Sequence, residues 1–279
     1  MDDEWGAGRL ELGAYLRRIG QPVPVRADER TLTRLHRAHV ASIPFDNADV
    51  ALGRTVPVEL DDVQEKLVLR ERGGYCYEHG VLFAAVLERL GFTVDRLLAR
   101  IGDETETPRP RTHMALHVRS DDGAWLADVG FGGGVLSPIR WDDADPVRQG
   151  GWRYRLRPHR PGGRQVLEQR DGPWQVLYSL DETPQHAVDV EMAAHFTATH
   201  PSSPFAGGRL IAMHKEDRRH RRLVGRTLTT SRPDGSAEER TLDDDELAAL
   251  LEEFALGLTD EETDRLVRAA PPQEPAETR

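Results

Sequence analysis

The fold is organised around residues 72–83, which read Arg72-Gly73-Gly74-Tyr75-Cys76-Tyr77-Glu78-His79-Gly80-Val81-Leu82-Phe83. Apolar residues recur at helical spacing from Cys76 until Gly91, and the pair Gly73-Gly74 predicts a tight turn into this helix. The first turn of a helix presents unpaired N–H groups and a positive dipole end, which favour a thiolate. Cys76, the only cysteine, is therefore a candidate nucleophile, although a lone cysteine is also a common inert core residue.

The composition excludes several classes of protein. The 279 residues are 38% hydrophobic, enough for two or three packed units, and the net charge of −11 argues against general binding to nucleic acid or anionic membranes. No metal site is expected, because the eleven histidines show no ligand spacing. The acidic N-terminus lacks the apolar segment of a signal peptide, no apolar run approaches the roughly 20 residues that span a bilayer, and no internal disulfide is possible. We therefore expect a soluble, cytoplasmic protein.

The apolar pattern changes near residue 91. Helices are predicted before it at 10–19, after an Asp28 N-cap until Pro44, and over 57–69, with no strand between them. Alternation then predicts short strands in an antiparallel sheet or small barrel, at 94–101, 114–118, 125–131, 152–156, 165–168 and 174–180. Residues 243–258 and 261–270 are predicted to be helical. An exposed loop at Gly102–Pro110 and a disordered tail from Pro271 complete the expectation.

The segment Ser120-Asp121-Asp122-Gly123 predicts a hairpin between residues 113–119 and 124–131. With a loop of two or four residues, residue i faces residue 243 − i, so Ala115 faces Asp128. Asp128 then lies on one face with His113 and His117, each a diagonal neighbour within about 7–8 Å. The register does not choose between the two histidines.

Each of these residues alone has an ordinary structural explanation, as a half-buried strand histidine or as a carboxylate that accepts N–H bonds at a bend. Together with Cys76 they form a Cys-His-Asp set, in which histidine deprotonates the thiol and aspartate fixes the imidazole tautomer. The combination predicts nucleophilic catalysis by a cysteine.

At this point the sequence resembles the arylamine N-acetyltransferase family over nearly its whole length. No single motif suffices, but their order and spacing make the match specific. The matching motifs are Leu35-His36-Arg37-Ala38-His39, Ile43-Pro44-Phe45-Asp46-Asn47, Arg72-Gly73-Gly74-Tyr75-Cys76-Tyr77-Glu78, Arg111-Thr112-His113-Met114, Asp128-Val129-Gly130-Phe131-Gly132-Gly133 and Thr199-His200-Pro201-Ser202-Ser203-Pro204-Phe205.

The resemblance implies an α+β fold of three parts: an N-terminal helical bundle (1–90), a central antiparallel β-barrel (91–200) and a C-terminal α/β lid (201–270), before the tail at 271–279. It implies a cysteine-protease-like triad of Cys76, His113 and Asp128, since the family's histidine follows Arg-Thr. The implied reaction is ping-pong: acetyl-CoA, a co-substrate and not a bound cofactor, acylates Cys76, and an arylamine, hydrazine or N-hydroxyarylamine then takes the acetyl group.

Substrate or CoA contacts are expected at six positions of these motifs. Phe45 and Phe131 are interpreted as walls of an aromatic pocket or as ordinary core residues. Glycines after Asp128 would let backbone approach the acyl-CoA arm. The expected contacts are Phe45, Thr112, Phe131, Gly132, Gly133 and Phe205. The chain departs from the family pattern at Gly80, where members commonly have Asn, so the side-chain hydrogen bonds of an Asn are absent there.

Three further points stay open in the sequence. The basic cluster of Lys215 and the residues 218–222 (Arg218, Arg219, His220, Arg221 and Arg222) is interpreted either as a docking site for the phosphates of CoA or as a solvated hairpin tip. An amide synthase that closes a polyketide macrolactam from a carrier-bound thioester shares the same triad. A non-catalytic small-molecule-binding or redox-responsive homologue is a third hypothesis. The sequence does not reveal the oligomeric state.

Overall fold

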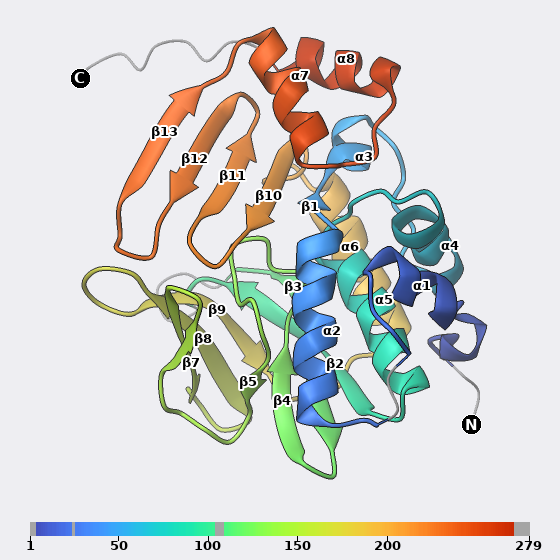
Figure 1. Cartoon of the computed structure of the whole chain (residues 1–279), viewed down its shortest axis with the longest axis vertical. Coiled ribbons are helices and arrows are strands. Elements are labelled where there is room, and N and C mark those ends of the chain that lie inside the picture. The colour runs from blue at the N-terminus through green and yellow to red at the C-terminus, as the bar shows by residue number, and fades with distance from the viewer. Residues whose placement is uncertain (1–3, 24–25, 104–108, 271–279) are drawn as a thin grey trace.

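The computed structural model describes residues 4–23, 26–103 and 109–270. Figure 1 shows N-terminal helices along one side, a curled sheet beside them, and a smaller sheet with two helices at the C-terminal end. The tail expected from Pro271 and part of the loop expected at Gly102–Pro110 lie outside the described residues. The α+β architecture predicted from the sequence is confirmed.

The N-terminal helices pack around α5 (Cys76–Arg89), whose residues 76–87 are all buried. Its first residue is Cys76, as predicted. Asp28 caps α2 as predicted, with its carboxylate accepting from the Thr31 amide at 2.8 Å. The helix predicted over 57–69 begins only at Leu60, and its second half is a π-helix. The other helical elements here are η1 (Ala7–Arg9), α1 (Leu12–Arg18), α2 (Glu29–Ser42), α3 (Ala48–Ala51), α4 (Leu60–Gln64) and η2 (Glu65–Leu69).

Gly73 and Gly74 are needed for a close backbone approach, and the prediction that they form a tight turn was wrong. Neither has a positive φ. A Cβ at Gly73 would lie 2.6 Å from the Pro44 carbonyl oxygen, and the Gly74 carbonyl accepts from the Asp46 amide at 2.8 Å. A strand, β1 (Phe45–Asp46), therefore runs against the start of α5. The expectation of no strand before the cysteine was also wrong, because two residues are too few for a visible alternation.

The central sheet has eight antiparallel strands in the order β5-β4-β3-β2-β9-β8-β7-β6 and curls until β5 contacts β7. It forms a nearly closed barrel. A strand lies at each of the six predicted places, but the one predicted over 125–131 ends at Ala127, where the chain leaves the ladder. The strands β5 and β6 were missed because they are only two and three residues long. The strands are β2 (Thr93–Ile101), β3 (Arg111–Ser120), β4 (Gly123–Ala127), β5 (Ile139–Arg140), β6 (Val147–Gln149), β7 (Trp152–Pro158), β8 (Gly163–Gln169) and β9 (Gln175–Asp181).

The register of the β3–β4 hairpin is the predicted one. Ser120 pairs with Gly123, so the loop has two residues, and His117 faces Leu126. In both pairs the two residue numbers add up to 243, as the predicted register requires. Asp128 directly follows β4, where the chain leaves the ladder toward α5.

The C-terminal part contains the lid sheet, of order β1-β10-β11-β12-β13, whose first strand is donated by residues 45–46. One face of this sheet packs on α7 and α8 through a leucine-rich core. The helix α6 precedes it, and its Val190 and Ala194 belong to the same core as α5. The remaining elements are α6 (Ala187–Thr199), β10 (Ile211–Lys215), β11 (His220–Val224), β12 (Thr227–Ser231), β13 (Ala237–Thr241), α7 (Asp244–Glu253) and α8 (Asp260–Ala269). The division at residues 90 and 200 stays a prediction.

Buried charges tie α8 to the segment that enters α5. The Arg72 guanidinium donates to Glu262 of α8 at 2.9 Å and to Asp49 at 3.1 Å. Lys66 bridges Asp49 and Glu78, both at 2.8 Å. Each of these partners is at most about one-tenth exposed, so removing one charge leaves a buried group of opposite sign with fewer counter-ions.

Replacing Arg72 with Met is expected to lower the free energy of unfolding by about 3–5 kcal/mol, because Glu262 and Asp49 lose a buried counter-ion. Urea unfolding followed by fluorescence measures the change. The control is Arg9→Met, which breaks a pair with Asp61 in which both side chains are 59% exposed and should cost less than about 1 kcal/mol. Equal losses in the two variants would contradict the assignment.

Candidate active site

A central cavity of about 510 Å³ opens between the helices, the barrel and the lid sheet. Eight of the nine predicted site residues line it, and the ninth, Asp128, lies behind His113. The eight are Phe45, Cys76, Thr112, His113, Phe131, Gly132, Gly133 and Phe205. The structure thus brings together residues from five separate motifs of the sequence.

Cys76 is buried at the first position of α5, with its thiol directed to the Thr112 carbonyl oxygen at 3.7 Å. Burial raises the pKa of this thiol well above its ordinary value, and the nearby Asp128 charge raises it further. Backbone N–H groups of Met114 and Tyr77 act in the opposite direction and lower the pKa. The favourable helix start is therefore outweighed by burial, and the thiol is protonated unless a neighbouring base accepts its proton.

His113 is fixed by Asp128. Its Nε2 donates to Asp128 Oδ2 at 2.8 Å, and both side chains are almost fully buried. The imidazole packs against the rings of Phe131 and Tyr178, with centroid distances of 5.0 and 4.9 Å. With Nε2 engaged, Nδ1 is the nitrogen left to accept a proton inside the cavity.

The carboxylate of Asp128 is satisfied at both oxygens. Oδ2 also accepts from the Tyr178 hydroxyl at 2.7 Å, and Oδ1 accepts from the amides of Gly130 and Phe131 at 3.1 and 2.9 Å. Burial alone would raise the pKa of this carboxyl, but the charge of His113 and the hydrogen bonds from His113 and Tyr178 outweigh it and lower the pKa to about 2. Asp128 is therefore ionised wherever the protein is folded near neutral pH.

Two residues that support Asp128 were missed in the sequence. Tyr178 lies in a predicted strand, but nothing in the alternation marks its hydroxyl as a partner of Asp128. His36 lies in a quoted motif without an assigned role; its Nε2 accepts from the Asp128 amide at 3.1 Å, and its Nδ1 donates to the Leu136 carbonyl at 3.2 Å. Burial lowers the pKa of His36 to about 3, so it acts as a neutral hydrogen-bonding group.

His117, the second candidate histidine, lies elsewhere. Its Nδ1 is 3.3 Å from Asp95 Oδ2, and its ring packs on Trp141 at a centroid distance of 4.1 Å. The choice that the register left open falls on His113, the histidine that contacts Asp128.

The start of α5 is backed by a buried chain of neutral groups. The Tyr15 hydroxyl bonds to His39 Nδ1 at 2.9 Å, and His39 Nε2 bonds to His79 Nδ1 at 2.8 Å. His79 Nε2 then donates to the carbonyl of Gly74 at 3.1 Å. Burial lowers the pKa of both histidines, to about 4 for His79, so this chain holds the backbone before Cys76 without placing a charge there.

Glycines also set the distance between the parts of the site. A Cβ on Gly130 would lie 2.8 Å from the Cys76 carbonyl oxygen and 2.9 Å from its Cα, so only glycine allows the Asp128 loop to approach the start of α5 this closely. Gly80, the departure from the family pattern, lies under Met114: a Cβ there would be 2.9 Å from the Met114 sulfur. The volume of a larger side chain at position 80 is occupied by Met114, the neighbour of His113.

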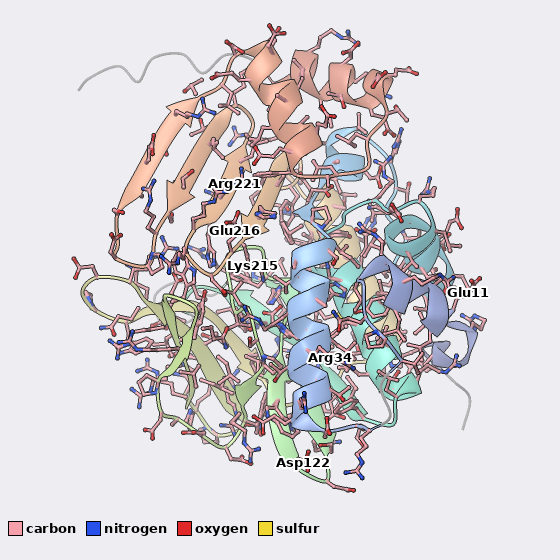
Figure 2. All side chains as sticks on the ribbon, in the orientation of Figure 1. Glu11, Arg34, Asp122, Lys215, Glu216 and Arg221 are labelled. Carbon is pink, nitrogen blue, oxygen red and sulfur yellow. The ribbon has the colours of Figure 1, made fainter. Side chains whose placement is uncertain are left out.

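The basic cluster is divided by the fold. The hairpin between β10 and β11 leaves residues 217–219 exposed, as the solvated-tip interpretation expects. Lys215, His220 and Arg221 are instead buried, against that interpretation. Figure 2 shows Lys215 where the lid sheet meets the barrel; its Nζ donates to the Phe131 and Val135 carbonyls at 2.8 and 3.2 Å. Burial lowers the pKa of Lys215 to about 8.

Within residues 4–23, 26–103 and 109–270, no cluster of three or more His, Cys, Asp or Glu side chains is arranged to hold a metal ion. The helices of the same ranges include none with the length and hydropathy needed to cross a membrane.

Known proteins of one family are similar to this chain over most of its length. The N-acetyltransferase family model matches residues 28–263. The arylamine N-acetyltransferase of Mycolicibacterium smegmatis is 40% identical over 90% of this chain and 94% of its own. The Nocardia farcinica arylamine N-acetyltransferase structure superposes with a TM-score of 0.87 at 40% identity, covering 96% of this chain and 98% of its own. The Mycobacterium marinum arylamine N-acetyltransferase, solved in complex with CoA, gives 0.84 at 30% identity, with 93% and 99% covered.

Gly130→Ala is expected to lower the free energy of unfolding by about 3 kcal/mol, because the new methyl group meets backbone atoms of Cys76 that cannot move aside. Gly133→Ala is the matched control: no atom lies within 4 Å of its Cβ position, so the change should stay within about 1 kcal/mol. Chemical denaturation of both variants measures the difference. Similar values for the two would contradict the close approach.

Tyr178→Phe should move acid unfolding to higher pH. Asp128 has a folded pKa of about 2, below its unfolded value, so its stabilisation is present above about pH 4 and is lost as the pH falls toward 2. Removing the Tyr178 hydroxyl raises the folded pKa and brings this loss to higher pH. Circular dichroism against pH measures the midpoint. Tyr77→Phe, which removes a buried hydroxyl bonded to Thr197 instead of a carboxylate, should lower stability without this shift.

Proposed function

The chain belongs to the arylamine N-acetyltransferase family, and we propose that it transfers an acetyl group from acetyl-CoA, through a thioester on Cys76, to the nitrogen of an arylamine, hydrazine or N-hydroxyarylamine. The observation that carries the proposal is the cavity that Cys76 shares with His113, whose imidazole is bonded to the buried Asp128. The M. marinum relative solved with CoA supports acetyl-CoA as the donor.

In the first half-reaction, His113 Nδ1 accepts the proton of the Cys76 thiol, and the thiolate attacks the thioester carbonyl of acetyl-CoA. Because burial raises the pKa of Cys76, the thiolate exists only while the imidazolium lies beside it. Asp128 stabilises that imidazolium through the Nε2 hydrogen bond. The tetrahedral intermediate then expels CoA thiolate, which takes the proton from His113, and acetyl-Cys76 remains.

In the second half-reaction, the amine nitrogen attacks the acetyl carbonyl of acetyl-Cys76. The intermediate breaks its bond to the Cys76 sulfur, and His113 carries the amine proton to the departing thiolate. The products are the amide and the original thiol, so the cycle closes without a net change in the protein.

The acceptor side of the cavity suits a flat aromatic ring. Phe45 and Phe205 form a tilted pair with centroids 6.3 Å apart, and Phe131 lies against His113. Aromatic rings pack on such walls through offset or edge contacts. An aromatic amine held against these rings would present its nitrogen toward Cys76, which lines the same cavity.

Brief incubation with acetyl-CoA should add one acetyl group to the native protein and none to Cys76→Ala, as measured by intact-protein mass spectrometry. His113→Ala is expected to slow acylation by about 10²–10⁴-fold, the usual contribution of a general base. His117→Ala is the control and should retain most of the rate, because its ring is paired with Asp95.

Three results would overturn parts of this proposal. Loss of acylation in His117→Ala but not in His113→Ala would move the base to His117. Acylation by a carrier-bound thioester but not by acetyl-CoA would favour an amide synthase. No adduct with either donor, together with an unreactive Cys76 in alkylation against pH, would indicate a non-catalytic homologue.

A further inference from the structure

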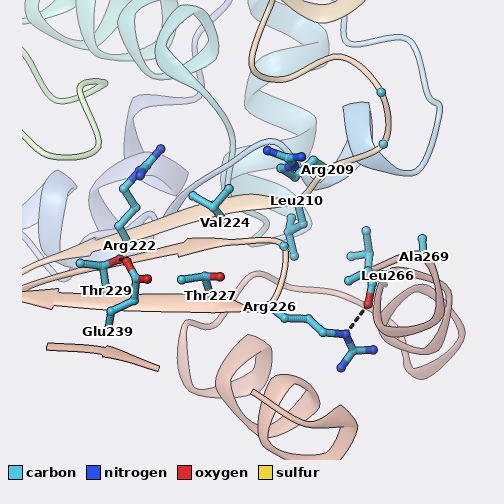
Figure 3. Close-up of a pocket in the computed structure, with 14 residues that line it drawn as sticks. Arg209, Leu210, Arg222, Val224, Arg226, Thr227, Thr229, Glu239, Leu266 and Ala269 are labelled. Carbon is cyan, nitrogen blue, oxygen red and sulfur yellow. Dashed lines mark hydrogen bonds between the residues drawn. The ribbon is translucent and has the colours of Figure 1, made fainter. Parts of the chain in front are cut away.

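Six lysine and arginine side chains are buried in the part of the chain that the structure describes: Lys66, Arg72, Arg96, Lys215, Arg221 and Arg226. Five of them pair with a carboxylate, as buried charges generally do. Figure 3 shows Arg226, which pairs with Asp244 at 2.7 Å and points toward α8, where it also donates to the Val267 carbonyl at 2.9 Å. Lys215 is the exception, because no carboxylate of the described residues forms an ion pair with it.

The Lys215 ammonium group bonds neutral acceptors instead. Its Nζ donates to the Phe131 carbonyl at 2.8 Å and to the Val135 carbonyl at 3.2 Å, and the described residues provide no acceptor for its third N–H. Burial lowers the pKa of Lys215 from its ordinary 10.5 to about 8, although the charge of Asp128 acts in the opposite direction. The folded surroundings therefore disfavour this ammonium group even with both carbonyl bonds made. A buried cation that costs stability is a candidate for a role in function.

Among the ionisable neighbours of Lys215, Asp128 is the charged group of the active site. Burial lowers the pKa of four histidines that face Lys215 from α2, α5 and β11, so they are neutral: His36, His39, His79 and His220. The remaining neighbours line a cavity of about 280 Å³ together with Lys215 and are paired there, Arg37 with Asp217, and Glu216 with His214 and Arg219. The charge of Lys215 helps His113 and Tyr178 to lower the pKa of Asp128 against the effect of burial.

The two carbonyls that Lys215 holds belong to the loop that carries the active-site contacts. The Phe131 amide donates to Asp128 at 2.9 Å while the Phe131 carbonyl accepts from Lys215, so this residue is held on both sides. The Phe131 ring packs against His113 at a centroid distance of 5.0 Å. The preceding residue, Gly130, makes the close approach to Cys76. Lys215, on β10 of the lid sheet, thus restrains the loop that lies against both His113 and the start of α5.

We propose that the Lys215 ammonium group is a positioning group for the acyl transfer, which holds Phe131 against the His113 imidazole and stabilises the Asp128 carboxylate. The inference rests on the proposed function. Lys215 lines the cavity of about 280 Å³ and not the central one, so it acts through the loop and does not touch the substrate. The charged form is the effective one, because charge-assisted hydrogen bonds are roughly twice as strong as neutral ones.

Single-turnover acylation by acetyl-CoA tests the proposal. Lys215→Met removes the ammonium group and keeps an unbranched side chain. We expect its maximal acylation rate to fall by about 10–10²-fold, as a displacement of about 1 Å produces, while the half-saturating concentration of acetyl-CoA changes by less than about twofold. In the native protein the rate should decline with an apparent pKa of about 8 as Lys215 loses its proton, and this decline should be absent in Lys215→Met.

Arg37→Gln is the matched control. It removes a cation from the same cavity of about 280 Å³, but Arg37 pairs with Asp217 and donates to neither the Phe131 nor the Val135 carbonyl. Its acylation rate and the decline near pH 8 should match those of the native protein.

Urea unfolding separates a positioning role from a structural one. The folded pKa of Lys215 lies below its ordinary value, so its charge destabilises the fold below about pH 8, and this cost is relieved as the pH rises toward 10.5. Lys215→Met should therefore unfold at a urea concentration no lower than that of the native protein at pH 7. Any advantage of the variant should shrink as the pH rises above 8.

Alkylation of Cys76 by iodoacetamide at pH 7 reports on the same thiol and imidazole without acetyl-CoA, and Cys76 is the only cysteine. If acetyl-CoA does not acylate the native protein, yet Lys215→Met slows alkylation about tenfold or more, the proposed function is wrong and the positioning role stands. Equal alkylation rates in the two proteins would overturn that role. A slower Lys215→Met that unfolds at lower urea than the native protein, or that keeps the decline near pH 8, would overturn it as well.

Discussion

The buried carboxylate of Asp128 constrains segments that are far apart in the chain. A buried charge is tolerated only when its hydrogen-bonding capacity is filled, and here the donors come from β3, β9 and the loop after β4. His36 of α2 holds the Asp128 amide as well. Because the same loop passes the carbonyl of Cys76 at a distance that only glycine permits at position 130, satisfying the carboxylate also positions His113 relative to α5. The position of α5 relative to the barrel therefore depends on the Asp128 carboxylate and on the absence of a side chain at Gly130.

The thiol is governed by two opposing effects. A position at a helix start lowers a thiol pKa, but this helix start is buried beneath the barrel and the lid, and burial dominates. A resting thiolate is thereby disfavoured, and ionisation is coupled to protonation of a neighbour that is itself stabilised by Asp128. The neutral Tyr15–His39–His79 chain behind α5 fits this balance, because a positive charge there would favour the thiolate independently of His113. Ionisation thus depends on the imidazole in the cavity.

The features that could be predicted from the sequence are those that periodicity and short-range backbone geometry determine. The parity of the β3–β4 hairpin predicted that Asp128 shares a face with two histidines. The observed ladder has the predicted register as far as Ala127, and Asp128 follows it directly. Parity could not choose between them, because the choice depends on Asp95 and Trp141 around His117 and on Tyr178 beside His113. These neighbours come from other strands and from the turn after β5, and their positions depend on how the sheet curls. The pairing of Phe45 with Met213 was not predicted either. A two-residue strand that pairs with a residue 168 positions later leaves no periodic pattern in the sequence.

The basic stretch shows why a cluster in sequence is a poor guide to a cluster in space. Successive residues of a strand point to opposite faces, so the run from His220 to Arg222 is separated as soon as β11 joins the lid sheet. Arg221 packs over the Phe254 ring and pairs with Glu253 on the side of α7, whereas Arg222 lies opposite Met213 and Thr229 of the neighbouring strands. The Lys215 ammonium group donates its hydrogen bonds to backbone carbonyls of the loop after Asp128. Of the six neighbouring basic residues, the fold therefore places His220 and Arg222 on one face of β11 and Arg221 on the other.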